Sequence, residues 1–373
     1  MPISKSEMPQ NTKSNLLLIS AIPPQPQNSG GATRIQNTIT ELSKYYNTDF
    51  ITFDESEIKL QPKNFSLFFT KFIPYWFTPW YNQKLISKIG DMVIQKHYDI
   101  IQVDFSQLLY LAKYLPQDTK KVFTAHDISS ISFYRRISEG HPSILKRLIR
   151  YFFFLQIYFY EKKYLPQYDT IISVSQKDQQ TLKHYLPHKN IICLKNGISE
   201  INFLKKTPSK IIKLGYIGSF EHTPNLNAVK YFYDQIAPLL DKEKINYEFY
   251  LAGKNDPEFI KNNFPKIIDL GQVKNTSDFY QKIDCLITPI FSGSGSRIKI
   301  LESLSFGVPV ISSPIGAEGI NINSDYLQIA TTPAEYIQSI QKIHHLNSDQ
   351  LSQQLKQLLW SEIFSKYHKI LNC

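Results

Sequence analysis

Short apolar runs alternate with longer stretches of helical periodicity along the whole chain. The runs are rich in Ile, Val, Leu and aromatic residues, and the segments between them are long enough to form helices. Strands that are apolar on both faces are typical of parallel sheets covered by helices on both sides. The predicted strands are 16–21, 49–54, 100–105, 121–127, 170–175, 191–195, 213–219, 247–253, 267–273, 285–290, 309–313 and 327–330. The pattern therefore predicts an α/β protein with two parallel sheets in series.

The length of the chain, 373 residues, also favours two domains. Single hydrophobic cores stop growing at about 250 to 300 residues. A polar, turn-rich stretch from Asn196 to Lys210 separates the two groups of predicted strands. We therefore predict one domain over residues 1–200 and a second over 201–354.

Two helices have clear signals in the sequence. One is predicted to take Thr223 as its N-cap and Pro224 as its first helical residue. Near the C-terminus, the amphipathic pattern of 355–371 predicts one continuous helix. The residues expected on its buried stripe are Trp360, Ile363 and Phe364.

Composition narrows the class of protein. The chain has 42 Lys and Arg against 32 Asp and Glu, a net charge of +10, which predicts attraction to phosphates, nucleic acid or an acidic lipid surface. The aromatic residues cluster in apolar blocks and no nucleic-acid-binding module is recognisable, so a nucleic acid partner is not expected. Cys193, Cys285 and Cys373 are too few and too far apart for a disulfide framework, which favours a reducing cytoplasm. No segment reaches the roughly 18 consecutive apolar residues of a spanning helix.

The stretch "FSGSGSRIKILESLSFGVPVISS", 291–313, carries the strongest functional signal. Its glycine-rich turn comes directly after a predicted strand and opens a helix, and in open α/β sheets ligands bind at the carboxyl ends of parallel strands. Exposed N–H groups and the helix dipole make such a helix start an anion site. Gly293 and Gly295 would let the backbone approach a phosphate closely. The turn therefore predicts a site for a diphosphate.

Three charged side chains follow the turn. Arg297 offers a bidentate fork and Lys299 a point charge for phosphate. Glu302, on the first turns of the helix, is placed to accept hydrogen bonds from two ribose hydroxyls. The alternative is an ordinary strand-to-helix connection, with Arg297 and Lys299 solvated and Glu302 paired to a neighbouring lysine.

These motifs resemble a known family. The stretch "GSGSRIKILESLSFGVPVISSPIGAEGI", preceded by "LGYIGSFEHTPNLNAVKYF", looks like the donor-binding half of the family-four glycosyltransferases of the GT-B fold, those that build bacterial surface polysaccharides. The likeness extends to "SGGATR", "YDTIISVSQKDQQTL", "NGI" and the closing "LLWSEIFSKYHKIL". It implies two Rossmann-like domains facing across a cleft, with the C-terminal helix, about 355–373, packed back on the first domain.

The resemblance also implies an activity. Such enzymes bind a nucleotide-sugar donor, UDP- or GDP-linked, mainly on the C-terminal domain, and a glycan or lipid-linked acceptor mainly on the N-terminal domain. They transfer the sugar with retention of configuration and need neither a metal nor another cofactor. This chain contains no Asp-x-Asp motif, which agrees with metal independence. The implied process is cell-surface polysaccharide synthesis.

One departure from the family concerns a site residue. Members often carry two glutamates with seven residues between them, the first touching the donor sugar and the second the ribose. Glu302 matches the second, whereas Ser294 stands at the first position. Ser294 and the backbone at Gly295 are the expected contacts to the donor in its place.

The N-terminal half supplies the other candidates. Gly30 and Gly31 would let the loop after the first strand approach the diphosphate or the acceptor, unless they only form a tight turn. His126, at a strand end, corresponds to a histidine that contacts the donor sugar in the resembling enzymes, although a lone histidine is often structural. Asp127 is expected to orient His126, to bind the acceptor hydroxyl or to cap a helix. Arg34 is expected to be a surface or capping residue.

Two positions in the second half complete the predicted site. Gly218 ends the strand 213–219 and would let its loop pass close to the diphosphate. The loop that follows, "SFEHTPN", has no cation, so Arg297 and Lys299 are expected to bind the phosphates. Glu318 is expected either to face the donor sugar or to cap a helix.

Two segments, 65–89 and 144–165, are both basic and aromatic. A cationic surface with exposed Phe, Tyr and Trp would suit docking to the anionic inner face of the plasma membrane, where a lipid-linked acceptor would lie. In the alternative, the aromatic residues are core and the cations a solvated face.

Two rival functions remain open from the sequence. One is a degenerate GT-B protein that binds a nucleotide or glycan without turnover, which Ser294 keeps open. The other is a sugar-nucleotide epimerase of the same architecture.

Overall fold

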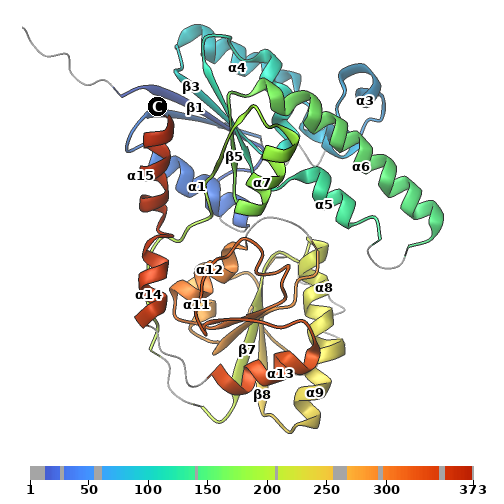
Figure 1. Cartoon of the computed structure of the whole chain (residues 1–373), viewed down its shortest axis with the longest axis vertical. Coiled ribbons are helices and arrows are strands. Elements are labelled where there is room, and N and C mark those ends of the chain that lie inside the picture. The colour runs from blue at the N-terminus through green and yellow to red at the C-terminus, as the bar shows by residue number, and fades with distance from the viewer. Residues whose placement is uncertain are drawn as a thin grey trace, which may run out of the picture.

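The computed structural model describes residues 13–25, 29–53, 61–138, 142–205, 209–254, 267–292, 297–343 and 349–371. The chain forms two lobes of alternating strands and helices, one above the other in Figure 1. The strands are β1 (Asn15–Ser20), β2 (Asn47–Thr52), β3 (Ile100–Asp104), β4 (Lys120–Ala125), β5 (Thr170–Ser173), β6 (Asn190–Cys193), β7 (Ile212–Ile217), β8 (Tyr247–Ala252), β9 (Ile267–Asp269), β10 (Cys285–Thr288), β11 (Val310–Ser312) and β12 (Leu327–Ile329).

The helices that cover these strands are mostly short. They are α1 (Gly30–Leu42), α3 (Ser66–Lys71), α4 (Gln83–Gln95), α5 (Ser129–Arg135), α6 (Ile144–Tyr164), α7 (Gln176–Tyr185), α8 (Thr223–Tyr231), α9 (Ala237–Lys242), α11 (Thr276–Tyr280), α12 (Ile298–Ser305), α13 (Pro333–Lys342), α14 (Asp349–Lys356) and α15 (Trp360–Leu371). Tighter 3₁₀ segments are η1 (Tyr75–Trp80), η2 (Ser106–Tyr114) and η3 (Leu165–Gln167), and η4 (Phe232–Ile236) is π-helical.

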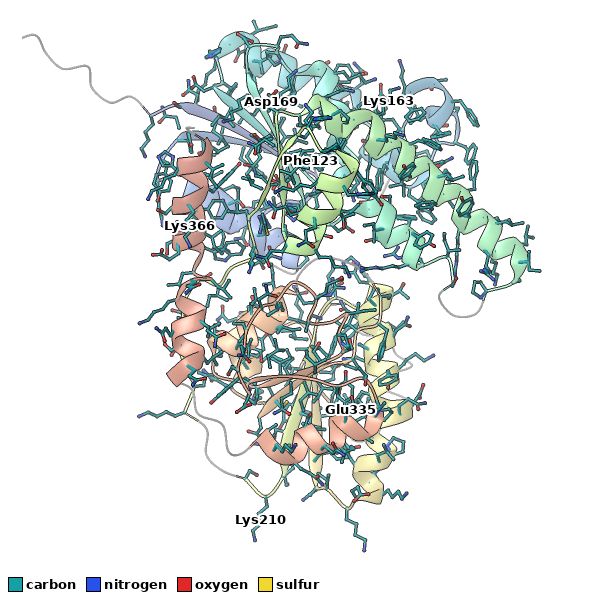
Figure 2. The ribbon with its side chains drawn as sticks, in the orientation of Figure 1. Phe123, Lys163, Asp169, Lys210, Glu335 and Lys366 are labelled. Carbon is teal, nitrogen blue, oxygen red and sulfur yellow. The ribbon has the colours of Figure 1, made fainter. Side chains whose placement is uncertain are left out.

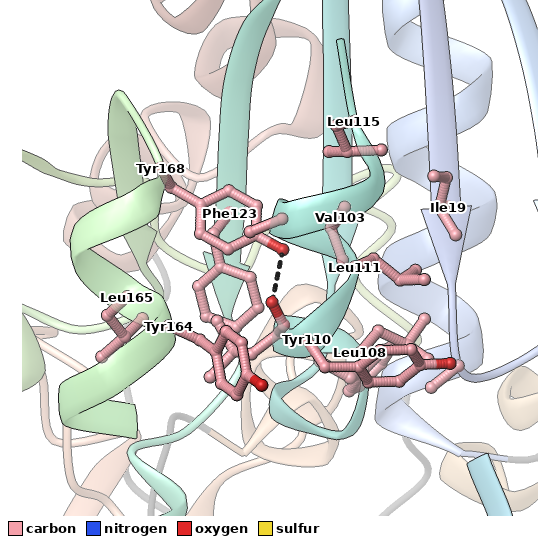
Figure 3. Packing of buried hydrophobic residues seen from close by; sticks show 14 of the residues in the cluster. Ile19, Val103, Leu108, Tyr110, Leu111, Leu115, Phe123, Tyr164, Leu165 and Tyr168 are labelled. Carbon is pink, nitrogen blue, oxygen red and sulfur yellow. Dashed lines mark hydrogen bonds between the residues drawn. The ribbon is translucent and has the colours of Figure 1, made fainter. Parts of the chain in front are cut away.

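The first lobe is built on a six-stranded parallel sheet with the order β2-β1-β3-β4-β5-β6. Successive side chains of a strand point to opposite faces. Leu17 and Ile19 of β1 therefore pack in the core beneath α4, η2 and α6, whereas Leu16 and Leu18 pack against α1 and α15. Figure 3 shows the first of these cores, where rings such as Phe123 are enclosed beside α6.

The second lobe repeats the arrangement with the order β12-β11-β10-β7-β8-β9, again all parallel. One face packs against α8, α9 and α13, and the other against α11, α12 and α14. Every predicted strand is present; β9 is shorter than predicted, because only Ile267–Asp269 pairs with β8. The prediction of two parallel α/β units is confirmed.

The prediction of one helix over 355–371 is wrong. The segment is divided between α14, which packs on the second lobe, and α15, which packs on the first (Figure 1). Between them Leu358 O accepts from the Ile198 N–H at 2.8 Å, and Ile198 O accepts from the Trp360 N–H at 3.0 Å. These backbone groups form a bridge between chain segments instead of continuing a helix. The predicted stripe of Trp360, Ile363 and Phe364 is nevertheless buried.

A glycine permits this crossing. A Cβ on Gly197 would lie 2.7 Å from Leu358 O and 2.8 Å from the Trp360 ring, closer than any side chain tolerates. The segment that leaves the first lobe, at Ile198, therefore contacts the segment that returns to it, at Leu358–Trp360. The two covalent connections between the lobes run side by side at this place.

Candidate functional site

A cavity of about 250 Å³ lies between the lobes. Its walls come from the carboxyl ends of β4, β7 and β10 and from the helices that follow them, the edge at which parallel sheets bind ligands. Both lobes contribute polar side chains. The residues that line it are Asp127, Ser132, Arg136, His222, Pro224, Asn225, Ile290 and Arg297.

Arg297 reaches this cavity from the start of α12, where it is the N-cap residue. Its Nη2 donates to the Ser292 carbonyl at 3.1 Å, which fixes the guanidinium beside the end of β10. Burial lowers the pKa of Arg297 from its ordinary value. The turn before it, 293–296, lies outside the described residues, and with it the predicted contacts of Gly293, Ser294 and Gly295.

Lys299 lies two residues after Arg297 and is not among the residues that line the cavity. Its Nζ donates to Tyr216 Oη at 3.0 Å and to Asn225 Oδ1 at 3.1 Å, and lies 4.2 Å from the centre of the Tyr216 ring. Burial and the neighbouring Arg297 lower the pKa of Lys299 to about 7. A Cβ on Gly218 would lie 2.8 Å from this Nζ and 2.9 Å from Asn225 Nδ2, so a larger residue there would displace the ends of both side chains. Lys299 is therefore enclosed by protein groups rather than solvated.

Glu302 follows Lys299 on α12. The Tyr280 hydroxyl lies 3.4 Å from Glu302 Oε2 and 2.9 Å from the Lys299 carbonyl, which places the phenol against the helix. Burial raises the pKa of Glu302 to about 7, although Tyr280 and Lys299 act in the opposite direction. Within the described part of the chain its carboxyl group has a tyrosine partner and no lysine within ion-pair distance.

His126 lies at the end of β4, behind Asp127. Its ring stacks on Phe105, with centroids 3.8 Å apart, and its Nε2 lies 3.3 Å from Oδ2 of the fully buried Asp104. Phe105 has a φ of 78°, a backbone conformation that costs energy for any residue other than glycine. Burial lowers the pKa of His126, although Asp104 raises it. The imidazole is held in a fixed orientation, but it is not among the residues that line the cavity.

Asp127 does line the cavity, together with Ser132 and Arg136 from α5 and its C-cap. It accepts hydrogen bonds from Ser129 Oγ at 3.1 Å and Ser132 Oγ at 2.8 Å. The N–H groups that open α5 donate to Glu161 of α6 instead, from Ser129 at 2.9 Å and from Ser130 at 3.3 Å. Glu161 thus takes the capping role considered for Asp127.

The Glu161 cap predicts a pH dependence of stability. Burial raises the pKa of Glu161 to about 7, so its contribution to the free energy of unfolding is full below about pH 4.5 and is lost as the pH rises through 7. Glu161→Gln keeps an acceptor oxygen and removes the titration. Wild-type stability is expected to fall by roughly 3 kcal/mol more than that of the variant between pH 5 and 8, as measured by urea unfolding. Glu200→Gln, at an exposed glutamate, serves as the control, and parallel curves for wild type and Glu161→Gln would contradict the assignment.

An ionic cluster joins the lobes beside the cavity. Glu318 of the second lobe accepts from Arg135 Nη1 at 3.0 Å and Nη2 at 3.2 Å, and also pairs with Lys177, both of the first lobe. Burial alone would raise the pKa of Glu318, but the hydrogen bonds from Arg135 and Lys177 lower it. Glu318 therefore bridges the lobes, a role that neither sequence-based alternative included.

The prediction for Arg34 is wrong. Its side chain is 2% exposed and donates to the Leu194 carbonyl at 2.9 Å, the Lys195 carbonyl at 3.1 Å and Asn196 Oδ1 at 2.7 Å. It also lies over the Trp360 ring, 5.7 Å from its centre. Burial lowers the pKa of Arg34 to about 10, despite the opposing charge of Asp104. Arg34 therefore connects α1 by hydrogen bonds to residues 194–196, which follow β6.

Gly30 and Gly31 open α1 after the N-cap Ser29. A Cβ on Gly30 would come 3.5 Å from Ile298 of α12, so the starts of α1 and α12 face each other across the lobes. A Cβ on Gly31 would come 3.2 Å from Phe105, the ring that supports His126. Gly30 therefore lies beside the residue that follows Arg297, and Gly31 beside the ring that stacks on His126.

Sequence reasoning missed several residues of the site. Asn225 lines the cavity and accepts a hydrogen bond from Lys299. In the sequence, the only feature that could have indicated this role was its position in the first turn of the helix after β7. The cap of that helix is His222 rather than Thr223, so His222 faces the cavity and Pro224 is the second helical residue. Nothing in the sequence indicated a site role for Arg136 except its position a few residues after the motif "FTAHDIS".

Comparisons with known proteins agree with this geometry. Residues 28–200 match the family described as Glycosyltransferase Family 4, and residues 212–345 match Glycosyl transferases group 1. An uncharacterised 44.6 kDa protein of the cps region of Klebsiella pneumoniae is 22% identical in an alignment of 254 positions, and the match covers 64% of this chain and 63% of that protein's length.

Solved structures share the fold. Sucrose-phosphate synthase from Thermosynechococcus elongatus superposes with a TM-score of 0.71 at 14% identity, over 96% of this chain and 98% of that one. The Anabaena protein HepE, solved with UDP and glucose, superposes with a TM-score of 0.59 at 14% identity, over 96% and 99%. With family matches in both lobes and glycosyltransferases of the GT-B fold among its structural neighbours, the chain belongs to the family-four glycosyltransferases.

Proposed function

We propose that this protein transfers a sugar from a nucleotide-sugar donor to a glycan or lipid-linked acceptor, with retention of configuration and without a metal ion. The observation that carries the proposal is the cavity between the lobes, where Arg297 lies at the start of α12, two residues before the buried Lys299. Two cations beside a helix start suit a diphosphate. Family membership and a cps-region relative favour a role in surface polysaccharide synthesis.

The donor would be held mainly by the second lobe. Arg297 and Lys299 would bind the diphosphate, and Gly218 leaves room beside the Lys299 ammonium group. Glu302 would accept hydrogen bonds from the ribose, since its partner Tyr280 holds it in place. The nucleotide would be UDP or GDP, and UDP has the support that HepE, with the same fold, was solved with UDP and glucose.

The first lobe would supply the sugar and acceptor contacts. His126, oriented by Asp104 and Phe105, would contact the donor sugar through a ring that burial keeps neutral near pH 7. Asp127, in the cavity wall, would bind the acceptor hydroxyl.

The chemical step follows from the leaving group. The bond between the anomeric carbon and the diphosphate oxygen breaks, and its electron pair remains on the diphosphate. The acceptor oxygen bonds to the same face of the carbon, and its proton passes to the departing phosphate oxygen. Donors fixed beforehand around the developing charge lower the barrier by about 3 to 4 kcal/mol each. Arg297 and Lys299 are the groups that would act in this way.

A panel of UDP- and GDP-sugars tests the proposal. At least one donor is expected to raise the midpoint of thermal unfolding and to release nucleoside diphosphate, slowly to water and faster with an acceptor. Glu302→Ala should weaken binding of the free nucleotide about tenfold or more, since it removes a charge-assisted partner of the ribose. Binding without release for every acceptor would indicate a degenerate binder, and conversion of the free donor to its epimer would indicate an epimerase; either result contradicts the transferase proposal.

A further inference from the structure

The first lobe carries an apolar surface that no other element covers in the part of the chain that the structure describes. It spans the start of α3 and the first half of α6, and we call it the α3–α6 surface. Phe69 is 72% exposed, Ile144 78% and Leu145 67%, unusually high values for large apolar side chains. The Phe65 and Phe152 rings stack 5.9 Å apart, so the two helices form one continuous patch. Its members are Phe65, Phe69, Ile144, Leu145, Leu148 and Phe152.

The two halves of α6 have different surroundings. Ile157, Tyr160 and Tyr164, in the second half, are fully buried in the first lobe's core. The first half extends beyond the lobe, and Figure 2 shows its side chains pointing into open space. The core interpretation of this segment is therefore correct for the second half alone, and the first half exposes its apolar side chains to solvent.

Charge decides which occupant fits this surface. Lys146 and Arg147 are exposed among the apolar residues, and the stretches 61–72 and 142–160, which carry the surface, contain no Asp or Glu. A second copy of the chain would bring the same positive charge to the contact. An anionic bilayer instead offers an apolar layer beneath negative headgroups, the environment that a basic helix with exposed Leu and Phe matches.

The helix that carries this surface also contacts the cavity wall. Arg150 of α6 donates from Nη1 to the carbonyl of Arg136 at 2.7 Å, and Arg136 lines the cavity wall. The helix that carries the exposed patch is thus bonded directly to the rim of the proposed acceptor side. No helix in the described ranges is long and apolar enough to cross a bilayer, so α6 would lie along the interface rather than span it.

We infer that the α3–α6 surface docks the protein on an anionic lipid bilayer through the first half of α6. The docking itself does not depend on catalysis. One consequence rests on the proposed function: the acceptor is a saccharide carried on a membrane lipid, which reaches the cavity past Arg136.

Sedimentation with lipid vesicles tests the docking, with the full-length protein and no donor present. The wild type is expected to bind vesicles of phosphatidylglycerol and phosphatidylcholine more tightly than pure phosphatidylcholine. Leu145→Ser with Leu148→Ser, and separately Lys146→Gln with Arg147→Gln, should each weaken binding about tenfold or more. The loss in the charge variant should shrink in high salt, because salt screens it.

Matched variants elsewhere on the lobe control for general effects. Lys84→Gln with Lys88→Gln removes the same charge from the exposed face of α4, and Ile94→Ser removes an 84% exposed apolar residue. Neither should change vesicle binding. The inference would be overturned if the wild type did not bind anionic vesicles, or if the variants of the α3–α6 surface bound them as tightly as the control variants do. Patch-dependent self-association in sedimentation velocity without lipid would also overturn it, because it would identify an interface between copies.

Donor hydrolysis separates this inference from the proposed function. The variants of the α3–α6 surface leave the cavity residues unchanged. They should therefore release nucleoside diphosphate from a soluble donor at the wild-type rate. Vesicle binding by a protein that hydrolyses no donor would support the docking and contradict the transferase. Donor hydrolysis by a protein that binds no vesicles would support the transferase and contradict the docking.

Discussion

Replacement of Arg297 by alanine is expected to lower the rate of sugar transfer by about 100- to 1000-fold. The guanidinium lines the cavity, and its hydrogen bond to the Ser292 carbonyl holds it in place before the donor arrives. A hydrogen-bond donor fixed in this way stabilises the negative charge that grows on the diphosphate as the bond between the sugar and the diphosphate breaks. Steady-state release of nucleoside diphosphate measures the loss, which should fall mainly on kcat if Arg297 acts in the transition state.

Arg297→Lys is the informative companion. It keeps the charge and loses the bidentate fork, so it should recover only part of the rate. Thermal unfolding of both variants in the absence of donor separates a loss of chemistry from a loss of folded protein. Full activity in Arg297→Ala would remove the residue from the phosphate site and with it the main support for the proposed function.

Replacement of Arg34 by methionine is expected to lower the free energy of unfolding by about 3 kcal/mol. Methionine retains much of the volume, but three acceptors around Leu194, Lys195 and Asn196 lose the donor that they share. The contact with Trp360, which helps to hold α15 on the first lobe, is lost as well. The shift of the urea midpoint, followed by circular dichroism, is the appropriate measure, because two-lobed proteins need not unfold in one step.

Lys44→Met provides the matched control for Arg34→Met. Lys44 lies just after α1 and pairs with Glu41, but its side chain is 52% exposed, so the loss should stay below about 1 kcal/mol. Equal midpoints for the two variants would show that the buried network around Arg34 contributes little to stability.

Local sequence patterns predicted the elements of this protein well. A strand buried on both faces leaves a continuous apolar run, so every strand from β1 to β12 was recognisable without knowledge of its neighbours. The stripe of α15 was predicted for the same reason, since the spacing of apolar residues records which face of a helix is buried. Arg297 and Lys299 were found because their motif lies within a few residues of a strand end.

What the sequence determined by itself was therefore the set of strands, their order along the chain and the place of the glycine-rich turn before α12. The tertiary structure alone decided that Arg34 is buried, that Ile198 interrupts the C-terminal helix, and that Glu161 caps α5. It also decided that only half of α6 is covered. The physical reason is the range of the interactions: periodicity along the chain reports whether a face is buried, whereas the partner that buries or bonds it comes from residues that only folding brings near.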